Sequence, residues 1–463
     1  MSIAVYTATR RQFLGTAAAT TAAAQQNVRS ARRPNIIYMH SHDTGRYIQP
    51  FGCDVPTPNL QRLAGEGVLF RQAFSAAPTC SPSRAALLTG QCAHSSGMLG
   101  LAHRGFVLND YRQHLLYTLR DVGYTSALAG VQHIAKRPEM IGYDGVLPTA
   151  STKIADVAPV AVEFLKNAPR QPFFLDVGFF ETHRVFHVPG PQDDARFTKP
   201  PATVPDALRT RQDMAAFHAS ARALDAGIGD ILRALESAGL AEETLVISTT
   251  DHGIAFPAMK CNLNVHGTGV SLILRGPQGF RGGKVSDAMV SQIDLFPTIC
   301  DLLELPAPAW LEGRSIMPII RGERVAINER VFSEVTYHAA YEPKRAVRTG
   351  RWNYVRNFGG RGRPVLPNCD DGPSKDVWLE AGWSGRIVPP EELYDLVFDP
   401  NESRNLAEDA RLSTVKQEMR AQLDRWMETT QDPLLKGPVP APHGAEINDP
   451  NGVSPQEATI KVS

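Results

Sequence analysis

Short apolar runs that end in clusters of polar residues recur along the chain. Four of them cover residues 35–39, 124–129, 173–180 and 244–249. Continuous apolar runs of this length are typical of strands that are buried on both faces of a sheet. Helical stretches, such as the one from Ala215 to Ala238, lie between the runs. This alternation predicts an open α/β sheet.

Each of the four runs is followed by residues that can bind a ligand or a metal ion. In open α/β sheets, ligands bind beyond the carboxyl ends of the strands. Any one of these residues alone would more often cap its strand or occupy an ordinary loop. Their shared position predicts one site, which contains His42, Asp43, His133, His183, Asp251 and His252.

A helix is predicted between the first two strands. Thr57 has the position of an N-cap, Pro58 that of the first helical residue, and Gly67 that of the end. We expect this helix to pack on the sheet and to carry no chemistry.

A second helix start, at residues 80–84, combines a cysteine with a serine, a proline and an arginine. Ser81 can cap a helix that has Pro82 at its first position and ends at Gly90. Cys80 would then lie beside a helix N-terminus, where exposed amides bind anions and lower a thiol pKa. Arg84 could add a bidentate contact to a tetrahedral oxyanion. A lone cysteine is more often structural, but these neighbours favour a nucleophile. A thiolate phosphatase loop needs five residues between its cysteine and its arginine, whereas only three lie between Cys80 and Arg84. This spacing argues against plain thiol chemistry.

Composition narrows the possible partners. Lys plus Arg and Asp plus Glu are 48 each in 463 residues, so no overall field favours nucleic acid or an anionic membrane. No run approaches the roughly 18 apolar residues of a membrane-spanning helix. The six cysteines show neither a CxxC pair nor zinc-finger spacing.

Residues 1–24 are predicted to be a twin-arginine export signal. Arg10 and Arg11 precede an alanine-rich, weakly apolar stretch that ends in an A-x-A site at Ala22–Ala24. A disordered N-terminus with two chance arginines is the alternative. Export after folding places the mature protein in the periplasm or outside the cell.

The motifs around Cys80 resemble the signature of the type I, formylglycine-dependent sulfatases. Cys-Ser-Pro-Ser-Arg at 80–84 is followed by Leu-Leu-Thr-Gly at 87–90, and further matching stretches occupy 33–37, 57–60, 250–253, 392–395 and 399–402. Within that family the chain is most similar to the sulfamidases, the N-sulfoglucosamine sulfohydrolases, through residues 97–101, 256–257 and 426–433.

This resemblance implies an alkaline-phosphatase-like α/β fold. A large mixed sheet between helices would form the catalytic domain, residues 33–325. A smaller C-terminal α+β domain built on an antiparallel sheet would follow at 326–436. Residues 437–463, rich in Pro, Gly, Asn and Asp, are expected to be a loosely attached tail.

The resemblance also implies the chemistry at residue 80. A maturation enzyme would convert Cys80 to formylglycine, whose hydrated gem-diol would attack the sulfur of a sulfated saccharide. Asp251 and a divalent metal would activate the attacking hydroxyl, and Asp43 would hold the metal.

Four further residues receive roles from the same resemblance. Arg84 and Lys260 would neutralise the sulfate oxygens. His183 would protonate the leaving group, and His133 would take a proton from the second hydroxyl so that sulfate is expelled.

Three departures from the family pattern affect the metal and the anion site. His42 and His252 stand where an aspartate and an asparagine are usual, and Val131 stands in place of a lysine. Lys136 or Lys260 would have to compensate for that lysine. The family implies Ca²⁺, whereas two imidazoles favour Mn²⁺ or Zn²⁺. Alternatively, either histidine turns away to cap its strand and leaves a depleted calcium site.

The sequence leaves more than one possibility open for substrate recognition and for the activity. Four residues fall where the sulfamidase-like C-terminal domain contributes to its pocket, although a solvated surface is an equal alternative: Glu334, Tyr337, His338 and Arg348. The predicted function is hydrolysis of a sulfate ester or N-sulfate of a short saccharide. A phosphate or phosphonate hydrolase on the same fold, which His252 favours, and a non-catalytic carbohydrate-binding relative are the alternatives.

Overall fold

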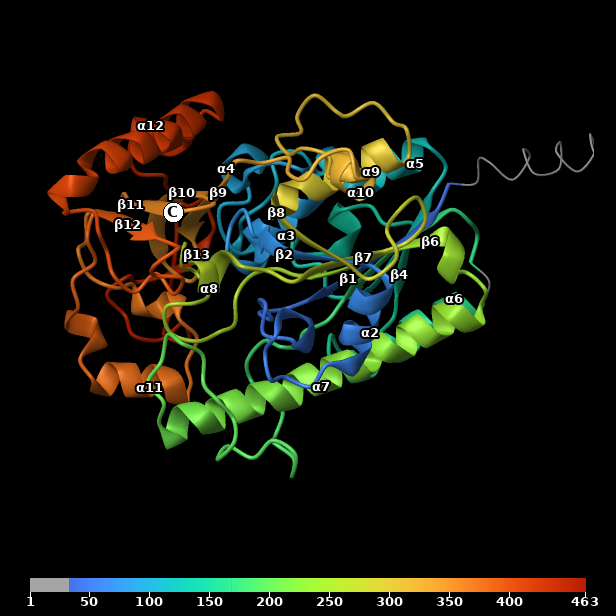
Figure 1. Ribbon diagram of the computed structural model, residues 1–463, viewed down its shortest axis with the longest axis horizontal. Helices are drawn as coiled ribbons and strands as arrows, with labels where there is room; N and C mark the ends of the chain where they lie inside the picture. Colours follow the sequence, from blue (N-terminus) through green and yellow to red (C-terminus); the bar gives the residue numbers. More distant parts are fainter. Residues whose placement is uncertain (1–32, 168) are drawn as a thin grey trace, which may run out of the picture. The chain divides into compact units, whose positions relative to one another are not determined.

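The computed structural model describes residues 33–167 and 169–463, so the predicted export signal at 1–24 lies outside the described residues. An eight-stranded sheet is the centre of the fold (Figure 1). Its strands follow the order β4-β3-β5-β1-β6-β7-β2-β8, and only β7 pairs with antiparallel neighbours. The strands are β1 (Asn35–Ser41), β2 (Val68–Phe74), β3 (Thr125–Gly130), β4 (Gly145–Leu147), β5 (Phe173–Gly178), β6 (Thr244–Thr250), β7 (Leu272–Arg275) and β8 (Lys284–Ser291).

The four apolar runs of the sequence form the adjacent parallel strands β3, β5, β1 and β6. Because successive side chains of a strand point to opposite faces, β1 contributes to two cores. Ile37 and Met39 belong to one, and Ile36 and Tyr38 to the other. The predicted α/β class is confirmed.

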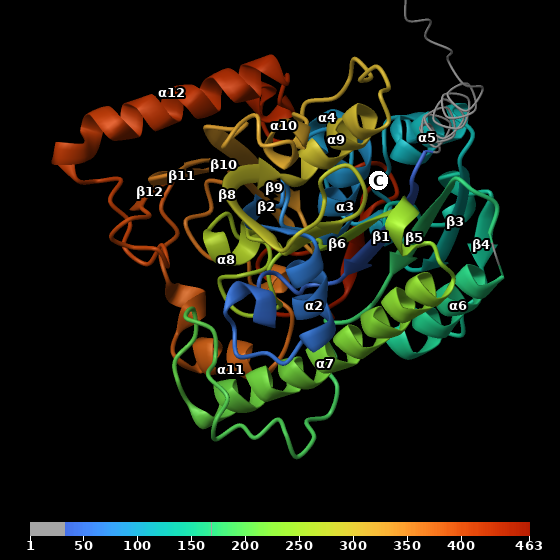
Figure 2. The same ribbon diagram turned by 45° about the vertical axis from the view of Figure 1, so that its right-hand side comes forward.

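Helices cover both faces of this sheet (Figures 1 and 2). One face carries α2 (Pro58–Glu66), α6 (Ile154–Lys166) and α7 (Leu208–Ser237). The other carries α3 (Cys80–Thr89), α5 (Leu115–Asp121), α9 (Leu295–Leu302) and α10 (Met317–Ile320). The remaining helices are α4 (Ala93–Ser96), α8 (Val265–Thr268), α11 (Pro373–Glu380) and α12 (Ser413–Thr429).

Two helix starts differ in detail from the sequence prediction. At α2, the Thr57 side chain does not cap the helix; the Asp225 carboxylate of α7 accepts the Asn59 and Leu60 amides instead, at 3.1 and 2.8 Å. At α3, the predicted cap at Ser81 is wrong, because the helix already begins at Cys80 and the Ser81 hydroxyl accepts the Ala102 amide at 3.0 Å. At the starts of both α2 and α3, contacts with distant parts of the chain thus replace the predicted local cap.

A smaller antiparallel sheet follows, with the order β12-β11-β10-β9. It consists of β9 (Arg330–Tyr337), β10 (Tyr341–Thr349), β11 (Trp352–Asn357) and β12 (Glu391–Asp395), with α12 packed on it. β9 begins just after the expected boundary near residue 325. Contacts such as Glu334 N to Ala76 O, 2.9 Å, join the two sheets, and residues 35–463 form one compact unit.

Residues 437–463 are more firmly held than the expected loose tail. They form a hairpin of β13 (Glu446–Asn448) and β14 (Thr459–Lys461). Arg104 Nη1 donates to Asn448 Oδ1 at 2.6 Å, and the Asn448 amide donates to Ala339 O at 2.8 Å. Lys375 Nζ donates to Val453 O at 2.7 Å. Ala441 and Ala445 also belong to the core, and Ile447 and Val462 pack against it, so hydrogen bonds and apolar contacts together hold the segment.

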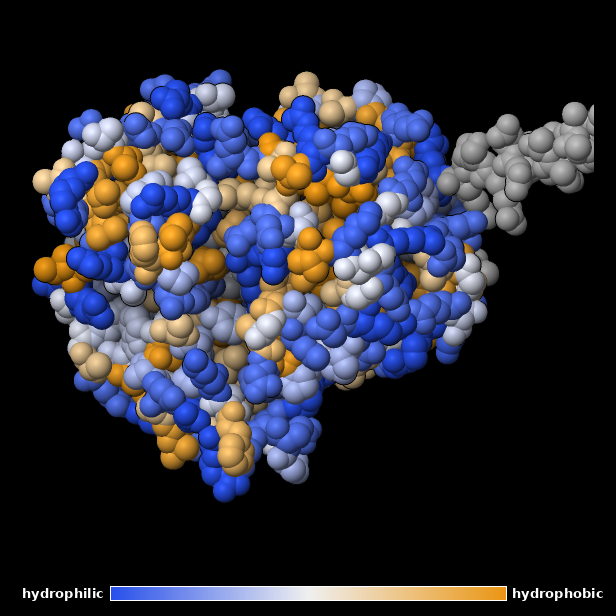
Figure 3. Space-filling view, viewed as in Figure 1, coloured by the Kyte–Doolittle hydropathy of each residue, from blue (hydrophilic) through white to orange (hydrophobic). Residues whose placement is uncertain are grey.

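Within residues 33–167 and 169–463, no helix is long and apolar enough to cross a bilayer. On the face seen in Figure 3, hydrophobic residues form small patches between hydrophilic ones. All six cysteines lie in the described part and are free thiols there.

Candidate active site

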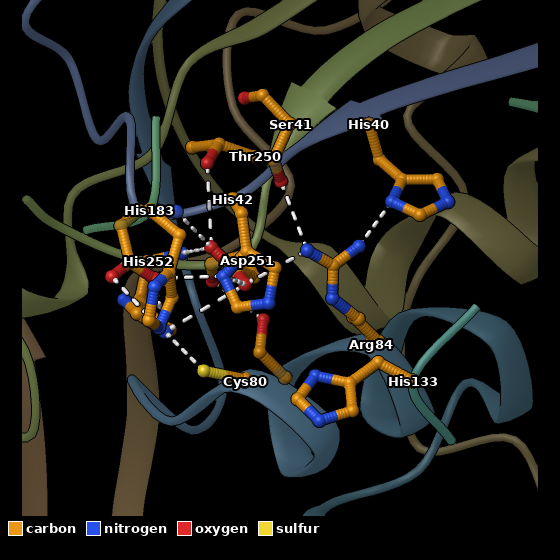
Figure 4. Close-up of polar contacts among 12 residues, drawn as sticks. His40, Ser41, His42, Cys80, Arg84, His133, His183, Thr250, Asp251 and His252 are labelled. Carbon is orange, nitrogen blue, oxygen red and sulfur yellow. Dashed lines mark hydrogen bonds and ion pairs between the residues drawn. The ribbon is translucent and has the colours of Figure 1, made fainter. Parts of the chain in front are cut away.

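The carboxyl ends of four adjacent strands form one site (Figure 4). His42 and Asp43 follow β1, His133 follows β3, His183 follows β5, and Asp251 and His252 follow β6. Cys80, Arg84 and Lys260 join them, so the structure brings together all nine residues that the sequence assigned to catalysis and metal binding.

Two buried carboxylates, Asp43 and Asp251, occupy the centre of the site. Asp43 has a left-handed backbone, with φ 55°, and its amide donates to Asp251 Oδ1 at 2.8 Å. The Nδ1 atom of His42 lies 2.9 Å from Asp43 Oδ1 and 3.1 Å from Asp251 Oδ2. An imidazole nitrogen therefore faces both carboxylates.

Both carboxylates keep their charge. Burial alone would raise their pKa values, but Lys260, His183 and His252 outweigh it at Asp43, and His252, His42 and Arg84 do so at Asp251. Burial lowers the pKa of His42 to about 4. His42 is therefore neutral at pH 7, as a metal-binding imidazole must be.

Cys80 points at these groups from the start of α3. Its Sγ atom lies 3.4 Å from His252 Nε2 and 4.0 Å from His338 Nε2. The predicted lowering of the thiol pKa is wrong: burial, aided by Asp43 and Asp251, raises the pKa of Cys80 well above its ordinary value. An unmodified thiol here is protonated and a poor nucleophile.

Arg84 is bound by protein acceptors in this structure (Figure 4). Its Nη2 atom donates to Asp251 Oδ2 at 2.9 Å and to Ser41 O at 3.0 Å, and its Nη1 atom contacts His40 Nδ1. His40 in turn contacts the buried Asp176 at 2.8 Å. This network orients Asp251, while direct contact between Arg84 and sulfate stays a prediction.

Lys260 is the cation that reaches the site in addition to Arg84. Its ammonium group lies 2.9 Å from Asp43 Oδ2, 2.9 Å from Asp370 Oδ2 and 3.4 Å from His183 Nε2. Burial opposes its charge, but Asp370 and Asp43 raise its pKa well above the ordinary value. Lys136, the other candidate to replace the lysine missing at Val131, is exposed.

The two catalytic histidine candidates line the outer part of the site. The Nδ1 atom of His183 donates to Arg184 O at 2.6 Å, so Nε2 is the nitrogen that faces Asp43 and Lys260. His133 has a left-handed backbone, with φ 57°, and its Nε2 atom lies 2.9 Å from His103 Nδ1. Each histidine thus has one nitrogen fixed by a partner.

Of the four substrate-binding candidates, only His338 reaches Cys80. Glu334 is buried and paired with His94 and Arg345. Tyr337 packs against Phe106 and donates to Val439 O. Arg348 pairs with Glu402 beside the Phe74 ring. The structure gives these three interior partners.

Sequence reasoning missed Asp370, His103, His40 and Asp176. Asp176 had a signal, because it is an acid inside an apolar run. Asp370 lies in an irregular segment and His103 in a short 3-10 helix, Ala102–Arg104, and neither follows a strand end. Only the tertiary fold brings Asp370 to Lys260.

The residues at the centre fit a divalent cation. One donor atom each of His42, Asp43, Cys80 and Asp251 lies within 4.8 Å of the others. The Nδ1 atom of His252 donates to Gly253 O at 3.0 Å, so Nε2 is the nitrogen that faces Asp43 Oδ1, at 3.4 Å. A divalent cation would satisfy the carboxylate oxygens and imidazole nitrogens that converge here. Mixed oxygen and imidazole donors suit Mn²⁺ or Zn²⁺, and the carboxylates alone suit Ca²⁺.

Comparison with known proteins gives consistent similarities along the chain. The family model described as sulfatase matches residues 34–305, and that of the N-sulphoglucosamine sulphohydrolase C-terminal region matches residues 264–361. Human N-sulphoglucosamine sulphohydrolase is 31% identical, with 83% of this chain and 88% of that protein covered. An ulvan-active sulfatase of Formosa agariphila is 27% identical, with 89% and 83% covered.

Solved structures share the fold. A 2-O GAG sulfatase has a TM-score of 0.70 at 22% identity, with 89% of this chain and 95% of that chain covered. A protein in complex with its substrate D-glucosamine-2-N,6-O-disulfate has a TM-score of 0.70 at 18% identity, with 88% and 99% covered.

Proposed function

Because the chain belongs to the sulfatase family of sulfuric ester hydrolases, we propose that it removes sulfate from a saccharide after Cys80 is converted to formylglycine. The observation that carries the proposal is the convergence of Cys80 with Asp43, Asp251 and His252. The high pKa of the unmodified thiol supports conversion, because a protonated cysteine would not attack sulfur.

The saccharide class follows from the relatives. Human N-sulphoglucosamine sulphohydrolase, the ulvan-active sulfatase and a Δ4,5-hexuronate-2-O-sulfatase of Bacteroides thetaiotaomicron are named for sulfated sugars, and each aligns with more than four-fifths of this chain. We therefore infer a sulfate ester or an N-sulfate of a sugar as the substrate.

Hydrated formylglycine supplies two hydroxyls on one carbon, of which one attacks sulfur and the other later expels sulfate. The protein must accept charge on the sulfate oxygens and move protons on either side. Lys260 is placed for the charge, since its ammonium is held beside Asp43 and Asp370. His183 Nε2 faces the more open side and would give a proton to the departing sugar atom, and His133 would take one from the second hydroxyl.

A divalent cation held by Asp43, Asp251 and the two imidazoles would act as a Lewis acid toward the sulfate. Arg84 then has a positioning role, because its bond to Asp251 Oδ2 fixes that carboxylate against His42.

Export by the twin-arginine signal would place the mature enzyme in the periplasm or medium. Conversion of Cys80 would require a formylglycine-generating maturation enzyme before export.

Mass spectrometry of the peptide across residue 80, on protein from its native host, tests the proposal together with turnover. We expect an aldehyde in place of the thiol, and hydrolysis of an aryl sulfate that Cys80→Ala abolishes without loss of the fold. Complete retention of cysteine in an active enzyme would rule out the mechanism.

Phosphate ester hydrolysis is the second candidate, and one observation favours it. His252 points Nε2 at both Asp43 and Cys80, which gives an Asp-His pair at the centre of the site. An aryl phosphate assayed beside the aryl sulfate separates the two activities. Faster phosphate hydrolysis would transfer the assignment, and no hydrolysis of either would indicate a carbohydrate-binding relative.

A further inference from the structure

A cavity of about 400 Å³ lies in the small C-terminal sheet region, outside the active site. Its walls come from the start of β10, the loop after β11, the segment before β12 and Pro450 of the C-terminal hairpin region. This volume is within the roughly 300–1,000 Å³ typical of small-molecule sites. We call it the β10 pocket.

The β10 pocket carries excess positive charge. Arg361 and Arg363 line it, and within residues 33–167 and 169–463 neither guanidinium has a carboxylate partner. Arg361 is held only through Nη1, which donates to Asn451 Oδ1 at 2.6 Å. The other two charged groups in the wall, Lys344 and Glu342, neutralise each other at 2.5 Å. The pocket therefore favours an anionic ligand.

The loop that presents the two arginines is shaped by glycine. Gly360 and Gly362, on either side of Arg361, have left-handed backbones, with φ 63° and 66°. The Val388 amide donates to Gly362 O at 3.0 Å and fixes the loop to the opposite wall. A turn of this kind requires residues that tolerate positive φ. It places Arg361 and Arg363 in the wall of one cavity.

The rest of the wall suits the body of a sugar ring. Tyr341, Val365, Val388 and four prolines give apolar surface, and Asn357 gives an amide. A pyranose ring has C–H faces that can pack on the apolar side chains and hydroxyls that can hydrogen bond to the amide. A carboxylate or sulfate on such a ring could accept two parallel hydrogen bonds from a guanidinium group.

The pocket is close to the active site along the chain. Tyr341 follows His338 by three residues, which limits their Cα atoms to about 11 Å apart. His338 Nε2 is 4.0 Å from Cys80 Sγ. The Asn448 amide, two residues before Pro450, donates to Ala339 O at 2.8 Å. The short connection between β9 and β10 thus has His338, which contacts Cys80, at one end and Tyr341 of the pocket wall at the other.

From this geometry we propose that the β10 pocket is a saccharide subsite that binds an acidic sugar residue, a uronate or a second sulfated sugar, next to the sugar that loses sulfate. The proposal rests on the proposed function and specifies its substrate: a short oligosaccharide with a second acidic group. Arg361 and Arg363 would determine specificity and take no part in the reaction.

Two substrates of different length test this proposal. We compare wild type with Arg361→Ala/Arg363→Ala on an aryl sulfate, which cannot reach the pocket, and on a sulfated disaccharide that contains a uronate. Charge-assisted hydrogen bonds of this kind predict a KM for the disaccharide about 10- to 100-fold higher in the variant. Turnover of the aryl sulfate should stay unchanged. Arg170→Ala, at an exposed arginine at the amino end of β5, is the matched control.

Calorimetric binding of the same disaccharide without its sulfate gives a second readout that needs no turnover. We expect binding to wild type that the double variant loses and that weakens with added salt. Equal affinities in wild type and variant, or an equal rise in KM for both substrates, would overturn the subsite. Absence of all sulfate hydrolysis would instead count against the proposed function and leave the binding test to decide the pocket.

Discussion

Two buried clusters in this protein are built from the same kinds of side chain, but they differ in charge balance. The active site combines His42 with carboxylates and two permanent cations. The second cluster, here the His94 cluster, consists of His94, Glu334, Arg345 and Asp432. It joins α4, β9, β10 and the segment after α12. Both clusters contain carboxylates and an imidazole that could hold a metal ion.

In the His94 cluster every charge has a direct partner. Arg345 donates to Asp432 through Nε at 2.5 Å and Nη2 at 3.1 Å, and lies 3.3 Å from Glu334. His94 Nδ1 is 2.9 Å from Glu334 Oε1. Two cations thus face two carboxylates when His94 is protonated. Its charges are therefore balanced, and the cluster acts as a pin that holds α4 and the segment after α12 against the small antiparallel sheet.

In the active site the carboxylates outnumber the permanent cations. Asp43, Asp251 and Asp370 are three acids beside two such cations, Arg84 and Lys260, and His42 is neutral. A divalent cation would reverse this balance and leave the site positive toward sulfate. Similar donors therefore serve structure where charges cancel, and chemistry where they do not.

The largest expected effect comes from a matched pair of aspartates, each held by an arginine. Asp251→Asn should lower kcat by at least about 10²- to 10³-fold, because it removes a charged contact from the reacting centre. Asp432→Asn, assayed per folded molecule, should leave kcat unchanged. Steady-state kinetics with active-site titration measures both. Equal losses in the two variants would remove the distinction between the clusters.

Asp432→Asn, which should leave kcat unchanged, should lower the free energy of unfolding. Asp432→Asn leaves Arg345 buried with only Glu334 as an acid partner, and breaking a buried ion pair costs about 3–5 kcal/mol of unfolding free energy. Denaturant unfolding with a fixed excess of metal checks the value. A cost below about 1 kcal/mol would mean that the cluster is not a structural pin.

The effect of a metal ion on stability should also differ between the two clusters. A cation that binds only the folded protein stabilises it by about 2.7 kcal/mol at a concentration of 100 times its Kd. We expect this gain when Ca²⁺, Mn²⁺ or Zn²⁺ is returned to chelator-treated wild type, and its loss in Asp43→Asn. Glu334→Gln should retain the gain, measured by thermal unfolding, since we expect the ion to bind at the active site and not at the His94 cluster. The ion that gives the full gain identifies the metal.

The sequence predicted one of these clusters and not the other, for a physical reason. Residues such as Asp43, His183 and Asp251 follow buried strands, and parallel strands end at one edge, so local pattern alone brings them together. His94 lies in the short helix α4 and Asp432 in the segment after α12, and the two meet only through long-range packing. Glu334 was accordingly expected in the substrate pocket, although it lies in the pin.

The same limit applies to the fold. The strands β1, β3, β5 and β6 could be read from their apolar runs, because burial on both faces leaves little choice of residue. The antiparallel direction of β7 and the packed hairpin of β13 and β14 could not, since both depend on partners far away in the sequence. The position of Asp370 in the active site likewise depends on residues far away in the sequence.

The smallest expected effect is a pH dependence confined to the His94 cluster. Burial lowers the pKa of His94, but Glu334, which also hydrogen bonds it, outweighs this; Arg345 opposes and Asp432 assists. The folded pKa is therefore raised above its unfolded value of about 6.5. Protonated His94 then contributes stability that is fully present below pH 6.5 and is lost as the pH rises through the folded pKa, by at most about 1.4 kcal/mol per pH unit.

His94→Gln tests this directly, because it removes the titrating group and keeps a hydrogen-bonding side chain. The difference in unfolding free energy between wild type and His94→Gln should be largest below pH 6.5 and should shrink at higher pH. A constant difference over the same range would show that the His94 imidazole is uncharged in the folded protein, and the charge balance of the cluster would then fail.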